Sequence, residues 1–163
     1  MNKEVTIRQA TIADIKGIQR LNHALFIKEY RDYDKTLNTK YTYSKKGKDY
    51  FRWRVINHHD GIIVVAEFNS RIIGYLAGGL LERKPSRLPA RYAELENMLV
   101  ESKSRSKGVG SKLIKYFFSW CEQKKVNFVK VTASSQNFRA QKLYHKIGFD
   151  DYDVVFLKKM RLK

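Results

Sequence analysis

Residues 96–113 read ENMLVESKSRSKGVGSKL, and this stretch decides the fold. It starts in an alternating run at 93–100 that favours a β-strand, and after a polar loop it enters a helix through Gly108 and Gly110. The first backbone N–H groups of a helix are unpaired and carry positive partial charge, which suits a phosphate. Glycines let a ligand approach that backbone closely, while Arg105 and Lys107 add charge. We therefore expect an anion site at this junction.

The junction matches neither of two common nucleotide motifs. It lacks the Gly-Lys-Ser/Thr of a P-loop, and Leu113 stands where a dinucleotide-binding Gly-x-Gly-x-x-Gly needs its third glycine. Taken alone, two glycines in a basic turn are more often an ordinary helix cap than a ligand site. The rest of the chain must decide between these interpretations.

Outward from this stretch, strands and helices alternate. Apolar periodicity predicts strands at 5–7, 61–68, 71–81, 93–100, 127–133 and 152–158. It predicts helices that start near 11, at 109 and at 137, and a further helix that carries Tyr50, Trp53 and Ile56. Thr11 and Asp14 form a helix-start pattern, Asn69-Ser70 a hairpin turn, and Gly148 a helix end. The run 82–91, with two prolines, reads as a loop. This order predicts an α/β layered fold, and we expect residues 1–163 to form a single domain.

Composition narrows the class of protein. Hydrophobic residues make up 43% and charged residues 30% of the 163 residues, which excludes an intrinsically disordered chain. One cysteine, Cys121, excludes a disulfide framework, and no run of residues is long and apolar enough to cross a membrane. We expect a soluble protein of the cytoplasm with no membrane partner. The 33 Lys and Arg residues against 16 Asp and Glu give a net charge of +17, which favours contact with phosphates, nucleic acid or acidic surfaces.

A second stretch, NFRAQKLYHKIGF at 137–149, allows the junction at 105–111 to be interpreted. Together the two resemble the GNAT superfamily of acetyl-CoA-dependent N-acetyltransferases, which carries Arg/Gln-x-x-Gly-x-Gly/Ala after its fourth strand and Asn-x-x-Ala-x-x-x-Tyr-x-x-x-Gly-Phe about thirty residues later. The second motif here is Asn137, Ala140, Tyr144, Gly148 and Phe149. The resemblance implies the GNAT acyl-CoA N-acyltransferase fold, a mixed central sheet of about six to seven strands flanked by about four helices.

The resemblance also implies a cofactor site for acetyl-CoA as co-substrate. Its pyrophosphate would lie on the backbone amides of Arg105, Ser106, Lys107, Gly108, Val109, Gly110 and Ser111. Its pantetheine arm would add as a pseudo-strand beside Met98, Leu99 and Val100. Asn137 would hydrogen-bond the cofactor or a splayed strand end, although it serves equally well as the cap of its own helix.

Two residues are implied for catalysis. Tyr144 would stand near the sulfur and protonate the departing thiolate, unless it is only a core tyrosine that faces Phe149. Glu94 would take the proton of the acceptor ammonium, because several family members keep a glutamate six residues before Val100. Glu96 lies two residues on and shares its face, and a water relay is a further alternative. Either glutamate could instead pair with Arg91 or a lysine.

The remaining polar residues carry weaker signals. His58-His59 beside Asp60 lacks a further ligand at metal spacing, so we expect no metal site there. Cys121 follows Trp120 on an apolar helix and is expected to pack rather than react. The aromatic residues of 41–53 among lysines are interpreted as half-buried residues in preference to a platform that stacks bases.

The sequence therefore predicts an N-acetyltransferase in which a primary amine attacks the thioester directly, with no acyl-enzyme. The acceptor is left open among a small-molecule amine, an amino acid and a protein or peptide amine. Basic segments at 40–54 and 82–91 favour an acceptor that carries a carboxylate or phosphate near its amine, or an N-terminus or lysine in an acidic peptide. The alternatives are a nucleic-acid- or ribosome-associated binding module on the same fold and a CoA-binding pseudo-enzyme. Contact with nucleic acid and a homodimer both stay open.

Overall fold

The computed structural model describes residues 4–160 and arranges them around a five-stranded sheet with the strand order β1-β2-β3-β4-β5. The strands are β1 (Thr6–Gln9), β2 (Gly61–Phe68), β3 (Arg71–Leu80), β4 (Tyr92–Val100) and β5 (Phe128–Val131). Neighbouring strands are antiparallel except β4 and β5, which are parallel. A parallel pair needs a crossover connection, and α3 (Val109–Gln123) provides it.

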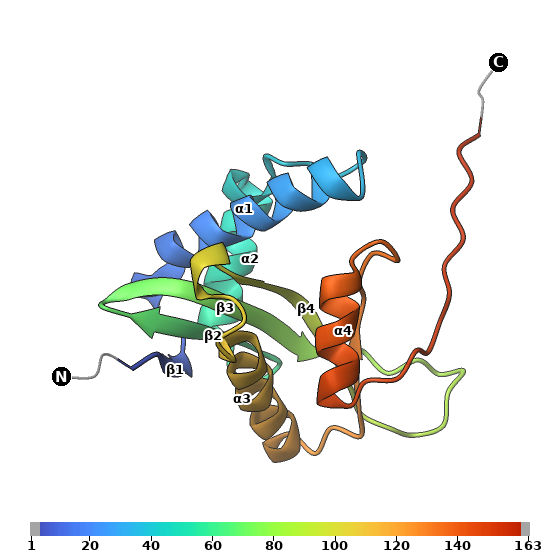
Figure 1. Ribbon diagram of the computed structural model, residues 1–163. Coiled ribbons are helices and arrows are strands. Elements are labelled where there is room, and N and C mark those ends of the chain that lie inside the picture. Colours follow the sequence, from blue (N-terminus) through green and yellow to red (C-terminus); the bar gives the residue numbers. More distant parts are fainter. Residues whose placement is uncertain (1–3, 161–163) are drawn as a thin grey trace.

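Helices cover both faces of the sheet (Figure 1). The helices α1 (Ile15–Asp32) and α2 (Lys45–Ile56) lie on one face, while α3 and α4 (Phe138–Ile147) lie on the other. Each face has its own apolar cluster: Leu21 and Phe51 belong to the first, Leu113 and Phe117 to the second. The mixed α/β architecture with four α-helices confirms the predicted fold class.

Local signals in the sequence explain where the elements begin and turn. At the entry to α1, the backbone N–H of Thr11 donates to Asp14 at 2.8 Å, and the short 3-10 helix Ile12–Asp14 leads into the α-helix. Asn69 and Ser70 both have positive φ, at 51° and 59°, the conformation that a tight hairpin between β2 and β3 requires. Gly148 ends α4 in the left-handed region with φ 101°. These three predictions are confirmed.

The strand count was predicted too high. The sheet has five strands rather than six to seven, because residues 152–158 form no strand. Val154, Phe156 and Leu157 in this segment are 77%, 91% and 92% exposed, and the chain runs away from the sheet after α4 (Figure 1). β-branched and aromatic residues favour a strand only where a neighbouring strand supplies hydrogen bonds, and none of the strands within residues 4–160 lies beside this segment.

A bulge shapes the strand on which the candidate site depends. Between β3 and β4 the register shifts, so that Ala77 pairs with Asn97 and Gly78 with Leu95, which leaves Glu96 as the extra residue. Bulges bend a strand and increase its twist.

Within residues 4–160 the helices include none that is long and apolar enough to cross a membrane.

Candidate active site

The second half of β4 has a free edge. Among the described residues β5 pairs only with Tyr92–Leu95, so Met98, Leu99 and Val100 have no strand partner on that side, where the carbonyl of Val100 accepts a hydrogen bond from the side chain of Arg105. On the other side these residues pair with β3 up to Val100 and Gly74. A row of unpaired main-chain groups can receive an extended ligand as an additional strand. The predicted pantetheine contact at 98–100 therefore falls on the open part of the edge.

The start of α3 stands just after this edge. Gly108 is the N-cap residue with φ 76°, and Lys112 is the first amide to bond back into the helix, at 3.0 Å to the carbonyl of Gly108. The amides of Val109, Gly110 and Ser111 thus belong to the first turn, where no carbonyl within the helix can accept them. The amide of Arg105 is used differently, because it donates to Ser102 at 3.3 Å.

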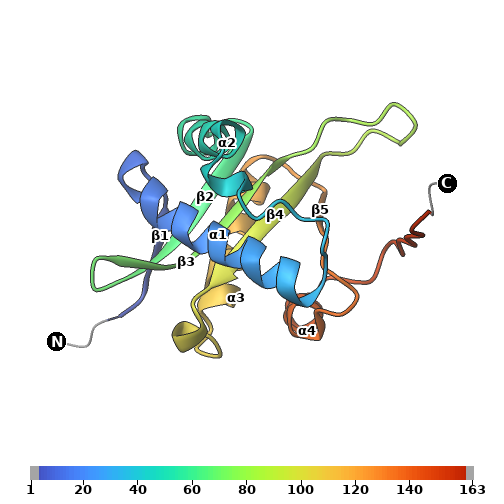
Figure 2. The same cartoon turned by 90° about the horizontal axis from the view of Figure 1, so that it is seen from above.

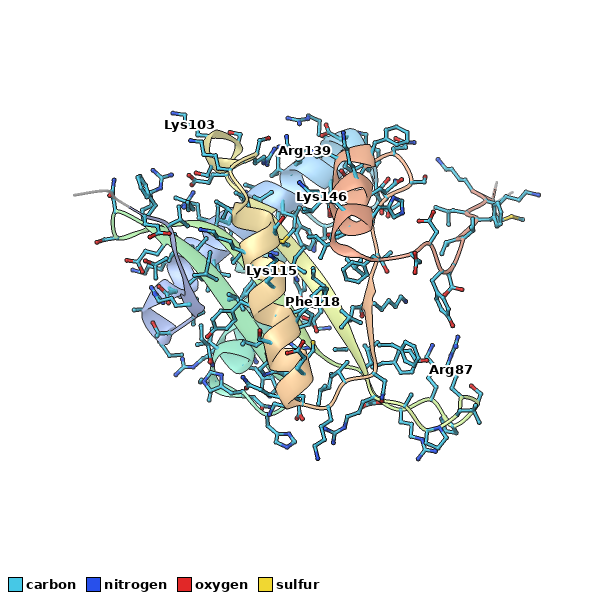
Figure 3. The ribbon with its side chains drawn as sticks, turned by 60° about the horizontal axis from the view of Figure 1, so that its bottom comes forward. Arg87, Lys103, Lys115, Phe118, Arg139 and Lys146 are labelled. Atoms are coloured by element: carbon cyan, nitrogen blue, oxygen red, sulfur yellow. The ribbon has the colours of Figure 1, made fainter. Side chains whose placement is uncertain are left out.

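Two guanidinium groups meet at the same loop. The Nε of Arg105 donates to the carbonyl oxygen of Val100 at 2.7 Å, and Nη2 of Arg139 donates to the hydroxyl of Ser106 at 3.3 Å. Burial, together with the charge of Arg139, lowers the pKa of Arg105. Figure 3 shows Arg139 on α4 near the loop that carries Lys103. Like charges held together in this way favour an anion between them.

Gly110 joins the loop to both α4 and β4. A Cβ added there would lie 3.4 Å from Leu143 and 3.9 Å from Met98, which is ordinary contact, so the protein itself tolerates a small side chain. Gly108 differs, since its positive φ favours glycine although nothing lies within 4 Å of an added Cβ. The backbone conformation therefore favours glycine at position 108, whereas the free protein does not require glycine at position 110.

The α4 motif residues fill the plainer roles that the sequence also allowed, as a helix cap and as a packed aromatic ring. Asn137 caps α4 by accepting the amide of Ala140 at 3.2 Å. Tyr144 packs edge-on against Phe149 with ring centroids 5.6 Å apart. Burial, with a smaller contribution from the charge of Glu29, raises the pKa of Tyr144 to about 12. The phenol therefore keeps its proton at neutral pH, as a proton donor must.

The structure separates the two glutamates on β4. Both alternate with Ala93 and Leu95, which are buried toward α3, so both face α1 and α2. Glu96 accepts hydrogen bonds from Tyr50 and Arg54 and is thereby compensated. Glu94 lies in the paired part of the strand, opposite Lys130 of β5. The partners of Glu96 are therefore Tyr50 and Arg54, and not Arg91.

Sequence reasoning missed a polar network on this face. The Nδ2 of Asn22 on α1 donates to the hydroxyl of Tyr75 at 2.9 Å, and Thr42 donates to Oδ1 of Asn22 at 2.6 Å. Arg54 is 9% exposed, and its Nε has no partner among the described residues. Gly61 and Gly79 leave room for the guanidinium of Arg54, because a Cβ on either would collide with it.

The other candidate residues stay outside the site. Cys121 is buried, and that burial raises the pKa of its thiol to about 12, so it packs as predicted. His59 pairs with Asp60, and across residues 4–160 no three His, Cys, Asp or Glu side chains gather as metal ligands. Phe51 is fully buried, in agreement with a packing role for part of the aromatic segment.

Comparison with known proteins adds a decisive observation to this geometry. The model of the acetyltransferase (GNAT) family matches residues 23–149, which include the free edge of β4, the loop and all of α4. The chain belongs to the GNAT acetyltransferase family. The match covers the elements that carry both sequence motifs, so the resemblance seen in the sequence is confirmed.

Individual relatives of this GNAT protein are distant. An uncharacterized N-acetyltransferase of Methanocaldococcus jannaschii is 28% identical over 160 residues, covering 94% of this chain and 64% of that protein. The L-2,4-diaminobutyric acid acetyltransferase of Wolinella succinogenes is 26% identical over 124 residues, covering 75% of this chain and 63% of that protein. The chain therefore spans less than two thirds of the length of these relatives. The aminoglycoside N-acetyltransferase AAC(6')-Iy, solved with CoA, has the same fold with a TM-score of 0.77 at 16% identity, covering 99% of this chain and 98% of that one.

Proposed function

We propose that this GNAT protein transfers the acetyl group of acetyl-CoA to an amine. The observation that carries the proposal is the free edge of β4 at Met98–Val100, which leads directly to the unpaired amides and guanidinium groups at the start of α3. An extended arm with a pyrophosphate at one end fits such an arrangement. The relatives named as N-acetyltransferases support the same reaction.

The residues of this chain would divide the work as follows. The amides of Ser106–Ser111 and the side chains of Arg105 and Arg139 would hold the pyrophosphate, and the edge of β4 would orient the thioester. Tyr144 would give a proton to the sulfur. Its raised pKa keeps the phenol protonated at neutral pH, so that the proton is available. Glu94 is the carboxylate that the resemblance offers as proton acceptor. Asn137 would act through its cap, by fixing the start of α4.

The acceptor we propose is a small amine that also carries a carboxylate. The exposed loop at 82–91 holds Arg83, Lys84 and Arg87 against Glu82, a balance that attracts a negative group. The relative from Wolinella succinogenes, named for a diamino acid, supports this class. Contact with nucleic acid, a homodimer and a single domain over residues 1–163 stay predictions.

The test uses the purified chain with acetyl-CoA and L-2,4-diaminobutyrate. Acetyl-CoA should raise the melting temperature, and the amine should cause release of free thiol with formation of an acetylated product. Stabilisation by acetyl-CoA without transfer to any amine would point to a CoA-binding protein that is not an enzyme. Neither stabilisation nor transfer would remove the proposal altogether.

A further inference from the structure

Glu29 continues the stripe of α1 that faces the sheet. Ile18, Leu21, Asn22 and Leu25 form this stripe and are buried at spacings of three and four. Glu29 follows Leu25 by four residues, so its side chain leaves the same face of the helix one turn later. Apolar packing does not explain a carboxylate at the end of this stripe, so its presence calls for another explanation.

The position of this turn follows from contacts earlier in α1. The hydrogen bond from Asn22 to Tyr75 fixes the middle of the helix above β3 and β4. Seven residues at about 1.5 Å each carry Glu29 about 10 Å further along the helix axis. Figure 2 shows that α1 crosses β3 and β4 and that its end points toward α4. The turn with Glu29 therefore lies over the side of β4 where the pairing with β5 ends.

The electrostatic surroundings agree with this placement. Burial is the main cause that raises the pKa of Tyr75 on β3 and of Tyr144 on α4, and the charge of Glu29 adds a smaller contribution to both. Burial raises the pKa of Glu29 itself, against the charge of Lys28. Among the described residues no side chain donates a hydrogen bond or forms an ion pair with the Glu29 carboxylate, because Lys28 pairs with Asp32.

We propose that Glu29, rather than Glu94, is the carboxylate that receives the ammonium group of the acceptor and takes its proton. The inference rests on the proposed acetyl transfer. Glu96 is already compensated by Arg54, and Glu94 lies in the part of β4 that is paired with β5, at the register position of Lys130. Glu29 forms no ion pair among the described residues, and the end of α1 that carries it points toward α4, the helix of the proposed proton donor Tyr144.

The protons balance in this assignment. One N–H bond of the ammonium breaks and its proton goes to Glu29, which passes it to solvent. The freed electron pair forms the bond to the thioester carbon, the C–S bond breaks, and the sulfur takes the phenol proton of Tyr144. A second proton from the acylated nitrogen restores that phenol. Ammonium and thioester thus become amide, thiol and one released proton.

A small set of titratable and charged groups around Glu29 determines the pH at which its carboxylate loses its proton. They are Lys28 and Asp34 on its own end of the helix, Tyr75 from β3, and Tyr144 from α4. Tyr41 follows in the next segment, and farther along β4 stands Glu96 with its partner Arg54. Because the folded protein raises the pKa of Glu29, kcat/KM should rise with pH through a value above the ordinary range of a glutamate.

The test compares the wild type with Glu29→Gln and with Glu122→Gln, an exposed glutamate on α3 that undergoes the same chemical change. Acetyl transfer to L-2,4-diaminobutyrate should fall by about 10²- to 10⁴-fold in Glu29→Gln, and the acidic limb of the pH profile should disappear. Stabilisation by acetyl-CoA should be unchanged. The free variant should melt slightly higher at neutral pH, since a partly buried charge without a partner is removed.

Three results would overturn the assignment, and they are distinguishable from one another. If the wild type transfers acetyl groups and Glu29→Gln keeps both rate and acidic limb, Glu29 is not the base. Loss of the limb in Glu94→Gln instead would return the role to Glu94. If the wild type binds acetyl-CoA but acylates no amine, the proposed function fails and this inference fails with it.

Discussion

Arg139→Ala tests the phosphate site most sharply, because its effects on binding and on stability should differ. The Arg139 guanidinium contacts Ser106 at 3.3 Å, and its charge contributes to the lowered pKa of Arg105. In the free protein its removal ends a repulsion and breaks one partly exposed hydrogen bond. We therefore expect the melting temperature without ligand to change by no more than about 2 °C.

The same change should weaken binding of acetyl-CoA. A hydrogen bond from a charged group is worth about 1.5–3 kcal/mol, which corresponds to an increase of about 10- to 150-fold in Kd. The loss should be specific for the phosphates, so S-acetylpantetheine, which has no pyrophosphate, should bind equally to both proteins. Isothermal titration calorimetry of the two ligands measures this difference.

A matched control comes from the same helix. Lys146 lies on the last turn of α4 and is also exposed, as Figure 3 shows. Lys146→Ala removes one positive charge at a distance of about 10 Å along the helix and should leave both affinities nearly unchanged. An equal loss for both ligands in Arg139→Ala, or no loss for either, would refute the placement of the pyrophosphate at this loop.

Three further predictions concern single residues. Tyr144→Phe should lower kcat by about 10²- to 10⁴-fold with unchanged affinity for acetyl-CoA; an unchanged kcat under conditions where chemistry is limiting would exclude it as the acid. Gly108→Ala should cost about 1–2 kcal/mol and lower the melting temperature by several degrees, because alanine is strained at φ 76°, and an equal melting temperature would contradict this. The Arg8 guanidinium lowers the pKa of Asp14, so this stabilisation is present above about pH 4 and is lost as pH falls through the folded pKa. Arg8→Ala should therefore have a lower free energy of unfolding at pH 7, and this free energy should fall less steeply as the pH is lowered. Urea titrations at several pH values would show both effects.

The elements that sequence predicted well are those fixed by local chemistry. The apolar face of α3, with Val109, Leu113 and Phe117, follows from helical periodicity, and all three side chains are buried. The caps of α1 and α4 follow from short-range hydrogen bonds and from a glycine that reaches positive φ. Such signals depend on neighbours in the sequence and need no knowledge of the rest of the fold.

The parts that sequence missed depend on contacts between distant segments. Residues 152–158 have the composition of a strand, but a strand also needs a partner, and none lies beside them. The pairing of Glu96 with Arg54 joins positions 42 residues apart, and that of Asn22 with Tyr75 joins positions 53 apart. The role assigned to Glu29 needs the direction of α1 across the sheet, which no spacing within the helix reveals.

The most direct test of the central claim follows thiol release and acetylated product together in one reaction of the wild type with acetyl-CoA and L-2,4-diaminobutyrate. We expect both to appear in equal amounts and both to require the amine. Thiol release without an acetylated amine, or stabilisation by acetyl-CoA with no thiol release across a panel of amines, would contradict the central claim.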